Sequence, residues 1–194
     1  FRRDQDAESQ AEKVHQQICQ VTAAMQNDLL PKTVDVCGRE YPIRSDYRVI
    51  LDICRVLDDT DYNQYDKALA VLVAFYPDIS DIPQEHYKEA LERCMWFIRC
   101  GDEEPDGKTP RLIDWDQDIR YIVSPINRVA GMEVRDVEYM HWWTFIGYFS
   151  EIGDCLFAQI VNVRQKLATG KTLNKDEREF YRKNRKLVDL KQRY

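Results

Sequence analysis

From Ser45 to the end of the chain, apolar residues recur at the three- and four-residue spacings of α-helices. Capping residues, glycines and prolines separate these repeats and mark where each helix is expected to begin and end. The expected N-caps include Ser45 or Asp46, then Asp114 and Asp136. The pattern predicts helices over residues 46–57, 64–75, 83–98, 114–130, 137–152 and 156–167, and a final basic helix that starts at Asn174 or Asp176.

The segment before the first of these helices predicts a small β-hairpin. Apolar residues alternate in Thr33–Val36 and Tyr41–Ile43, and Gly38 between them supplies the positive φ of a tight turn. Pro42 lacks an N–H donor, so the second strand is expected at a sheet edge. The expected fold class is therefore mainly α: a compact multi-helix domain with one small N-terminal β-hairpin.

Two of the predicted helices carry special features. The helix over residues 64–75 holds most of the longest apolar run, Ala68–Tyr76, and is expected to be the most buried. This run is too short to cross a bilayer, so no membrane contact is expected. Pro125 lies inside the helix over residues 114–130 and is expected to kink it or to split it in two.

Residues 1–29 form a separate segment with a coiled-coil-like repeat. The spacing predicts an amphipathic helix with a narrow apolar stripe. The stripe consists of Ala7, Ala11, Val14, Ile18, Val21 and Met25. A coiled-coil partner, packing on the same chain and marginal helicity remain open, because the two alanines bury little area. We expect residues 30–190 to form the helical domain, including its basic C-terminal helix.

The charge is distributed unevenly along the chain. Twenty-eight basic and 34 acidic residues give a net charge of −6, yet residues 171–194 carry nine basic and four acidic residues. Two interpretations of this basic tail are a contact for nucleic acid or an acidic partner, and a solvated helical face. The acidic remainder of the chain disfavours nucleic-acid binding. The candidate contact residues are Lys175, Arg178, Arg182, Lys183, Arg185 and Lys186.

Side chains that carry chemistry show no catalytic or metal-ligating pattern. The six cysteines and three histidines have no local ligand spacing, so free thiols, no metal and no cofactor are expected. Asp114 and Asp118 are one helical turn apart, which fits a shared site or the dipole-complementing residues of a first turn. His141 is a candidate general base or a histidine that satisfies a core hydrogen bond. Without a glycine-rich phosphate loop or a nucleophile motif, a non-enzymatic protein is expected.

An aromatic block at residues 139–149 is the most unusual part of the composition. Adjacent residues of a helix point about 100° apart, so Trp142 and Trp143 cannot both face one narrow groove. One interpretation leaves one indole at a partner-binding surface, and the other packs both within the core. The candidate partner-binding residues are Tyr139, Trp142, Trp143 and Phe149.

Short motifs in a fixed order resemble a known phage family. They are Leu30–Val34, Gly38–Pro42, Asp46-Tyr-Arg48, Phe75-Tyr-Pro77, Trp96–Gly101, Asp114-Trp-x-x-Asp118, His141-Trp-Trp143-x-Phe145 and Phe180–Lys183. The chain from about Leu30 to Leu190 is similar to the phage gene-product-fifteen family, and residues 1–29 lie outside this resemblance.

The resemblance implies a small helical protein of tailed phages or prophages of Gram-positive bacteria. Its gene is expected between those of the tail tube and the tape-measure protein, where tail-assembly chaperones are encoded. The implied function is transient binding of apolar helical segments of the tape-measure protein and recruitment of tail tube subunits. The implied location is the host cytoplasm, with absence from the virion. A structural protein retained at a tail or neck junction is the alternative, and self-association is a further expectation.

Overall fold

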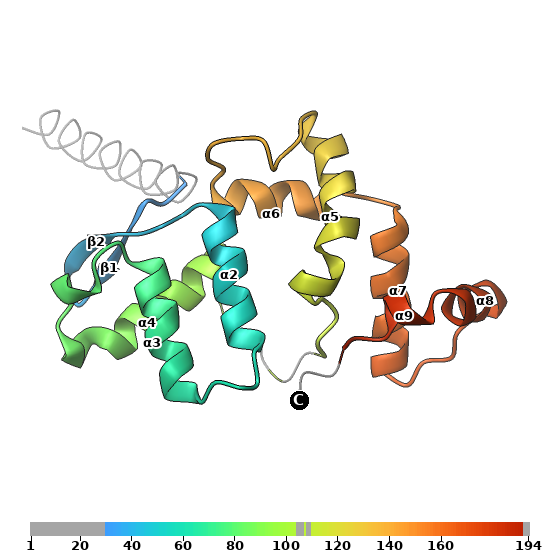
Figure 1. Cartoon of the computed structure of the whole chain (residues 1–194), viewed down its shortest axis with the longest axis horizontal. Coiled ribbons are helices and arrows are strands. Elements are labelled where there is room, and N and C mark those ends of the chain that lie inside the picture. The colour runs from blue at the N-terminus through green and yellow to red at the C-terminus, as the bar shows by residue number, and fades with distance from the viewer. Residues whose placement is uncertain (1–29, 104–106, 108–109, 192–194) are drawn as a thin grey trace, which may run out of the picture. The chain divides into compact units, whose positions relative to one another are not determined.

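The structure is a computed structural model that describes residues 30–103, 107 and 110–191. The chain divides into two units between Pro31 and Lys32, and the second unit is described below. The helix predicted over residues 1–29 lies outside the described residues. In the second unit, helices and one hairpin form the predicted mainly α fold, which is confirmed (Figure 1).

The hairpin pairs β1 (Thr33–Val36) with β2 (Arg39–Pro42) in antiparallel register. Its turn has only two residues, because Cys37 and Gly38 both adopt positive φ, at 51° and 79°. The second strand therefore begins two residues earlier than predicted. Glu89 of α4 (Tyr87–Ile98) accepts hydrogen bonds from the backbone N and the Sγ of Cys37, at 3.0 and 2.9 Å. This contact holds the turn against the helix.

Helices α2 (Tyr47–Asp58) and α3 (Gln64–Phe75) begin at side-chain caps, Asp46 and Asn63. Of the two caps expected for α2, the structure selects Asp46, and the bounds of α3 are as predicted. Arg44 closes the other end of α3, where its Nη1 donates to the carbonyls of Val73, Ala74 and Tyr76 at 2.8 to 3.0 Å. The last turn of α3 therefore has partners for its otherwise unpaired carbonyls.

Two short 3₁₀ turns, η1 (Ile79–Asp81) and η2 (Gln84–His86), lead from α3 into α4. Helix α4 ends as predicted near Gly101, which has a φ of 90°. The N–H of Gly101 donates to the carbonyl of Trp96 at 3.0 Å, the six-to-one hydrogen bond of a Schellman motif in which Cys100 takes the left-handed position at a φ of 57°.

Helix α5 (Trp115–Ala130) begins at Asp114 and ends at Gly131, as predicted. It continues across Pro125, so the predicted split is wrong, while a kink stays a prediction. Pro125 is buried among the core-facing residues of α5, and packing on this face offsets the missing backbone hydrogen bond.

The helix predicted over residues 137–152 is shorter in the structure. Helix α6 spans Trp142–Ser150 and is capped by His141 rather than Asp136. The backbone of His141 also forms an isolated antiparallel bridge with Asp46. Around this bridge, the N–H of Tyr47 donates to Met140 at 2.9 Å and that of Trp142 donates to Ser45 at 2.8 Å. These tertiary hydrogen bonds hold residues 139–141 extended, against their local helical pattern.

The C-terminal part comprises α7 (Leu156–Ala168), α8 (Lys175–Lys183) and the single turn α9 (Arg185–Val188). Asn174 caps α8 in a capping box with Glu177, which confirms one of the two predicted starts. The predicted basic helix is interrupted at Asn184, the residue between α8 and α9.

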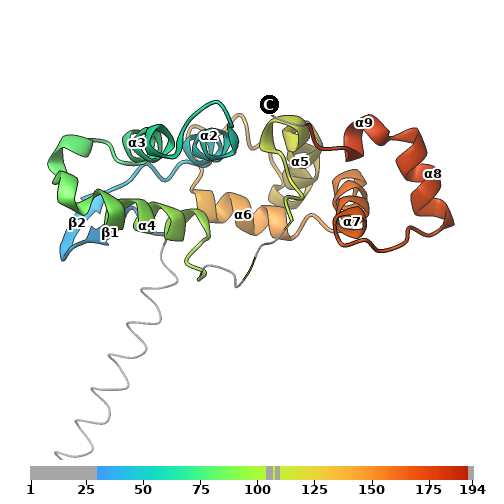
Figure 2. The ribbon, with the colours of Figure 1, turned by 90° about the horizontal axis from the view of Figure 1, so that it is seen from below.

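Each element packs against the next in a continuous series of contacts. The hairpin packs on α4, α4 on α3, α3 on α2, α2 on α5 and α6, and α5 on α7, which contacts α9 (Figures 1 and 2). At the centre, the rings of Tyr47 and Phe145 stack at 4.5 Å between centroids. Helix α3 is not the most buried, because α5 has six buried residues and α3 has three. The apolar run of α3 instead leaves one face exposed.

Candidate protein-binding groove on α3 and α4

An apolar groove of about 300 Å³ lies between α3 and the first turns of α4. Its lining residues are Tyr65, Ala68, Leu69, Leu72, Tyr87, Lys88 and Leu91. Lys88 is the only charged residue among them. The groove exists because the chain between α3 and α4 leaves their apolar side chains side by side without covering them.

An apolar ridge borders this groove along α3. Tyr62, Tyr65, Leu69 and Val73 are 53, 76, 40 and 50% exposed. Tyr65, Leu69 and Val73 are each four residues apart and share one side of α3, and Tyr62 lies just before the N-cap of this helix, Asn63. Of nine large apolar side chains exposed in the described residues, these four belong to α3 and the turn before it, and Tyr65 and Leu69 also line the groove. Such a surface is typical of a protein-interaction site.

Carboxylates surround the apolar ridge at its N-terminal end. Asp59, Asp61 and Asp66 flank Tyr62 and Tyr65, and none forms an ion pair within the described part of the chain. Lys67 donates to the carbonyl of Leu57 at 2.8 Å, and Lys88 lies 3.9 Å from Glu92. The surroundings of the groove are therefore acidic.

Trp142 and Trp143, two of the four predicted partner-binding residues, connect α6 with the end of α4. The indole Nε1 of Trp142 donates to the carbonyl of Ile98, and that of Trp143 donates to the carbonyl of Phe97, each at 2.9 Å. Trp142 is buried and Trp143 is half-buried against Trp96. Both indoles satisfy backbone carbonyls at the end of α4.

The other two members of that set lie apart. Tyr139 is exposed on the segment before α6, and its hydroxyl lies 2.7 Å from that of Ser45. Phe149, near the end of α6, is half-buried between Trp115 and Phe157. Tyr139 is the only one of the four with an exposed side chain, so its role as a partner contact stays a prediction.

The six basic residues proposed from sequence all lie on α8 and α9, and all are exposed. Lys183 pairs with Glu179 at 2.7 Å, and Arg185 pairs with Asp189 at 3.0 Å. The remaining four, Lys175, Arg178, Arg182 and Lys186, form no ion pair with any described residue. Three of them, Lys175, Arg178 and Arg182, share one face of α8.

The candidate carboxylate pair has a structural role in this fold. Asp114 accepts from the N–H groups of Asp116 and Gln117, at 3.0 and 3.1 Å, as the N-cap of α5. Asp118 is buried and binds Arg164 of α7 through two hydrogen bonds, at 2.6 and 3.0 Å. A bidentate arginine pair of this kind fixes the two helices together.

His141, the candidate general base, also has a structural role. The Nδ1 of His141 accepts from the N–H of Trp143 at 3.1 Å, so this ring caps α6. Burial raises the pKa of the Cys54 thiol to about 12 and that of Cys100 to about 11, which disfavours a reactive thiolate at neutral pH. Among the described residues, no three His, Cys, Asp or Glu side chains are grouped to hold a metal ion.

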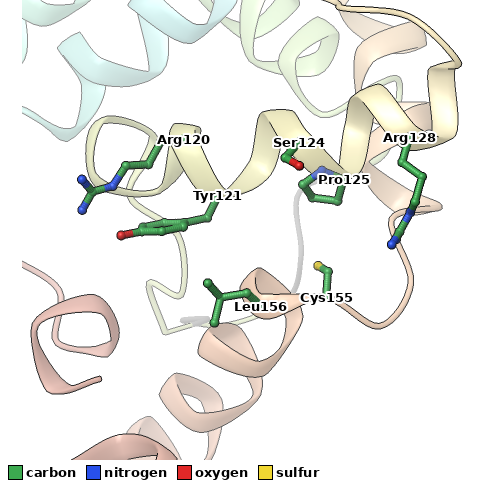
Figure 3. A pocket seen from close by; sticks show the side chains of 7 residues that line it. All are labelled: Arg120, Tyr121, Ser124, Pro125, Arg128, Cys155 and Leu156. Carbon is green, nitrogen blue, oxygen red and sulfur yellow. The ribbon is translucent and has the colours of Figure 1, made fainter. Parts of the chain in front are cut away.

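A second pocket, of about 280 Å³, lies between α5 and the start of α7 (Figure 3). Arg120 and Arg128 stand at its opposite ends, with Leu156 between them. Arg128 donates to the carbonyl of Ile152, and Arg120 lies over the ring of Tyr121. The two guanidinium groups therefore do not converge on one anion.

Sequence reasoning missed the groove because the apolar run of α3 was expected to make this helix the most buried one. A usable signal was present in the spacing. Tyr65, Leu69 and Val73 fall on one side of α3, Val71 and Phe75 fall on the buried side, and Leu72 lies between the two sides. An apolar arc that extends from the buried side of a helix to its exposed side indicates a second packing surface.

The fold and this site define a mainly helical protein with an exposed apolar groove, and none of its described helices is long and apolar enough to span a membrane. A family model described as Bacteriophage Gp15 protein matches residues 26–190. The chain therefore belongs to this family of bacteriophage proteins, which indicates a phage-associated structural or assembly role. The match begins four residues before the predicted start at Leu30. A search of curated proteins and a search of solved structures found no significant match.

Proposed function

We propose that this protein is a tail assembly factor that binds apolar helical segments of the tape-measure protein and helps to recruit tail tube subunits. The observation that carries the proposal is the exposed groove and ridge on α3 and α4. A long helical chain exposes apolar stripes until the tube surrounds it, and such stripes aggregate unless another surface covers them.

The groove suits a helical partner. An amphipathic helix binds a groove by inserting side chains at i, i+3 or i+4, and i+7 between the side chains of its walls. Tyr65 and Leu69 from α3, opposite Tyr87 and Leu91 from α4, supply such walls. No covalent step is involved, since the proposed activity only covers and releases apolar surface.

Release is as necessary as binding. A groove of this size buries few side chains, so each copy is expected to bind weakly. Many weak copies along one long partner give high occupancy together, while tube subunits displace them one at a time. The protein is then expected in the host cytoplasm and not in the finished virion.

Co-expression with the tape-measure protein of the same phage tests the proposal. The wild-type chain is expected to raise the soluble fraction of the tape-measure protein, and the double substitution Tyr65→Ser with Leu69→Ser is expected to abolish the gain. Leu167→Ser on α7 is the matched control, because Leu167 and Leu69 are 43 and 40% exposed. No gain from the wild-type chain, or an equal gain from the groove variant, would contradict the proposal.

The second candidate is a structural protein that stays in the particle at a tail or neck junction. Packing of α6 against α4 through both tryptophans favours a rigid body suited to permanent assembly. Mass spectrometry of purified virions separates the two functions. The assembly factor is expected to be missing, whereas a structural component is present in a fixed number per particle.

A further inference from the structure

We infer that the helix bound by the groove on α3 and α4 carries lysine or arginine residues beside its apolar stripe. This inference rests on the proposed function only in assuming that the groove receives a helix. It adds the charge of that helix, which neither the groove volume nor the family match specifies.

The first support is the charge of the chain that builds the groove. Residues 58–92 contain nine acidic and two basic residues. Of the two lysines, Lys67 is engaged with the carbonyl of Leu57, and Lys88 lies beside Glu92. Potentials complementary to this acidic surface come from a basic partner.

The second support is the position of the carboxylates that lack a cation. Asp58 differs from its neighbours, because Arg111 binds it at 3.0 Å. Asp59 accepts from the N–H of Asp61, and Asp66 accepts from the side-chain amide of Asn63, but neither has a cationic partner among the described residues. Asp61 is exposed, and its carboxylate forms no hydrogen bond within the described chain. All three lie within three residues of the ridge residues Tyr62 or Tyr65 in the sequence.

The apolar ridge and the carboxylates together indicate which side chains the bound helix carries. Large apolar side chains of the occupant fill the groove, and cationic side chains on its flank reach the α2–α3 connection. Lysine and arginine suit this position because their long apolar stems pack along Tyr62 and Tyr65 while their charges reach the carboxylates. An acidic helix would bring like charges together at the same place.

Two synthetic helical peptides test the inference directly. Both have leucine at the a and d positions of a heptad repeat, and they differ only in lysine or glutamate at the flanking positions. Fluorescence anisotropy with the full-length chain is expected to show that the lysine peptide binds about 3- to 10-fold more tightly at low salt, since each exposed ion pair contributes modestly. The difference is expected to shrink as salt rises, because the Debye length falls.

A charge reversal makes the test specific to this site. Asp61→Lys is expected to weaken binding of the lysine peptide and to strengthen binding of the glutamate peptide. The difference in affinity between the two peptides then becomes smaller. Glu151→Lys is the matched control, because Glu151 is exposed on another element, at the end of α6, and the same charge change there leaves the preference unaltered. Circular dichroism confirms that both variants are folded.

The outcomes separate this inference from the proposed function. Equal binding of both peptides, lost in the Tyr65→Ser and Leu69→Ser variant, overturns the charge inference and leaves the groove as a helix site. A preference that Asp61→Lys does not change also overturns it. Self-association that Leu69→Ser removes, detected by sedimentation without peptide, would assign the groove to a second copy instead. The co-expression experiment decides the proposed function independently of all three results.

Discussion

Arg164 is buried and makes five hydrogen bonds, so a single side chain joins three parts of the chain. Its guanidinium donates twice to Asp118 of α5, once to Leu112, and once each to Leu187 and Val188 of the C-terminal segment. The planar, permanently charged guanidinium suits such a position because its donors are fixed in one plane. The Asp114-Trp-x-x-Asp118 motif is thus explained by helix capping and by this buried ion pair.

Replacing Arg164 by alanine is expected to lower the free energy of unfolding by about 3–5 kcal/mol, because it leaves the Asp118 carboxylate buried without its partner. Urea denaturation monitored by circular dichroism measures the change. Arg185→Ala is the control, since Arg185 and Asp189 form an exposed ion pair, which is expected to contribute little to stability. Similar losses for the two variants would show that the burial of Arg164 has no energetic consequence.

The Glu133 carboxyl makes the stability of the folded protein depend on pH. Hydrogen bonds from Arg135 lower the pKa of the Glu133 carboxyl from 4.5 to about 2, and the amide of Asn127 donates to it as well. A lowered folded-state pKa stabilises the protein above the unfolded-state pKa, and this stabilisation is lost as the pH falls through the folded-state pKa. The stability difference between wild type and Glu133→Gln is therefore expected to be largest above pH 4.5.

That difference is expected to shrink between about pH 4.5 and pH 2, as the Glu133 carboxyl becomes protonated. Thermal unfolding of both proteins across this range provides the measurement. A difference that stays constant from neutral pH to pH 2 would refute the role of Arg135 in holding the carboxylate ionised.

At the scale of elements, the helix ends were predictable where a local signal sets them. Helix α5 begins at Asp114 and ends at Gly131, α3 begins at Asn63, and α8 begins at Asn174. Each of these ends depends on residues that are close together in the sequence. The start of α6 was not predictable, since His141 pairs with Asp46 far away in the sequence. Long-range hydrogen bonds to Ser45 and Tyr47 override the helical pattern of residues 137–141.

Two glycines allow this dependence on local conformation to be measured. Gly131 ends α5 with a φ of 68°, whereas Gly147 lies within α6 at an ordinary helical φ, and both have open space around the missing Cβ. Gly131→Ala is expected to destabilise the protein by about 1 kcal/mol, because alanine is strained at positive φ. Gly147→Ala is expected to stabilise it by up to about 1 kcal/mol, because alanine favours helix.

Denaturation midpoints of the two variants compare the same chemical change at two backbone conformations. Opposite signs are expected, since the surroundings differ little while φ differs greatly. Equal signs would mean that side-chain space rather than backbone conformation decides the effect.

At the scale of the whole molecule, the C-terminal segment closes the fold across α5 and α7. Gln117 of α5 donates to the carbonyls of Leu187 and Asp189, at 3.2 and 3.0 Å, and accepts from the N–H of Lys191 at 3.1 Å. Val188 is buried beside these contacts. The last described residues are therefore part of the folded domain, although their composition is that of a solvated basic tail.

A chain that ends at Asn184 loses the carbonyls of Leu187 and Val188 that Arg164 binds. Truncation and Arg164→Ala are each expected to destabilise the protein, and their combination is expected to cost less than the sum, because both remove the same hydrogen bonds. A double-mutant cycle from urea unfolding measures the coupling. Additive losses would show that the segment is held by other contacts.

The sequence by itself determined the mainly α fold, the hairpin and most helix ends, because these depend on periodicity, capping side chains and glycines that act within a few residues. It also carried the ordered motifs of the phage family. Only the tertiary structure decided which apolar residues are covered. Trp142 and Val73 are both large apolar residues in helical segments, yet one packs beneath α4 and the other stays exposed beside a groove. Burial depends on which elements meet in space, and the pairing of α3 with α4 leaves the candidate site open.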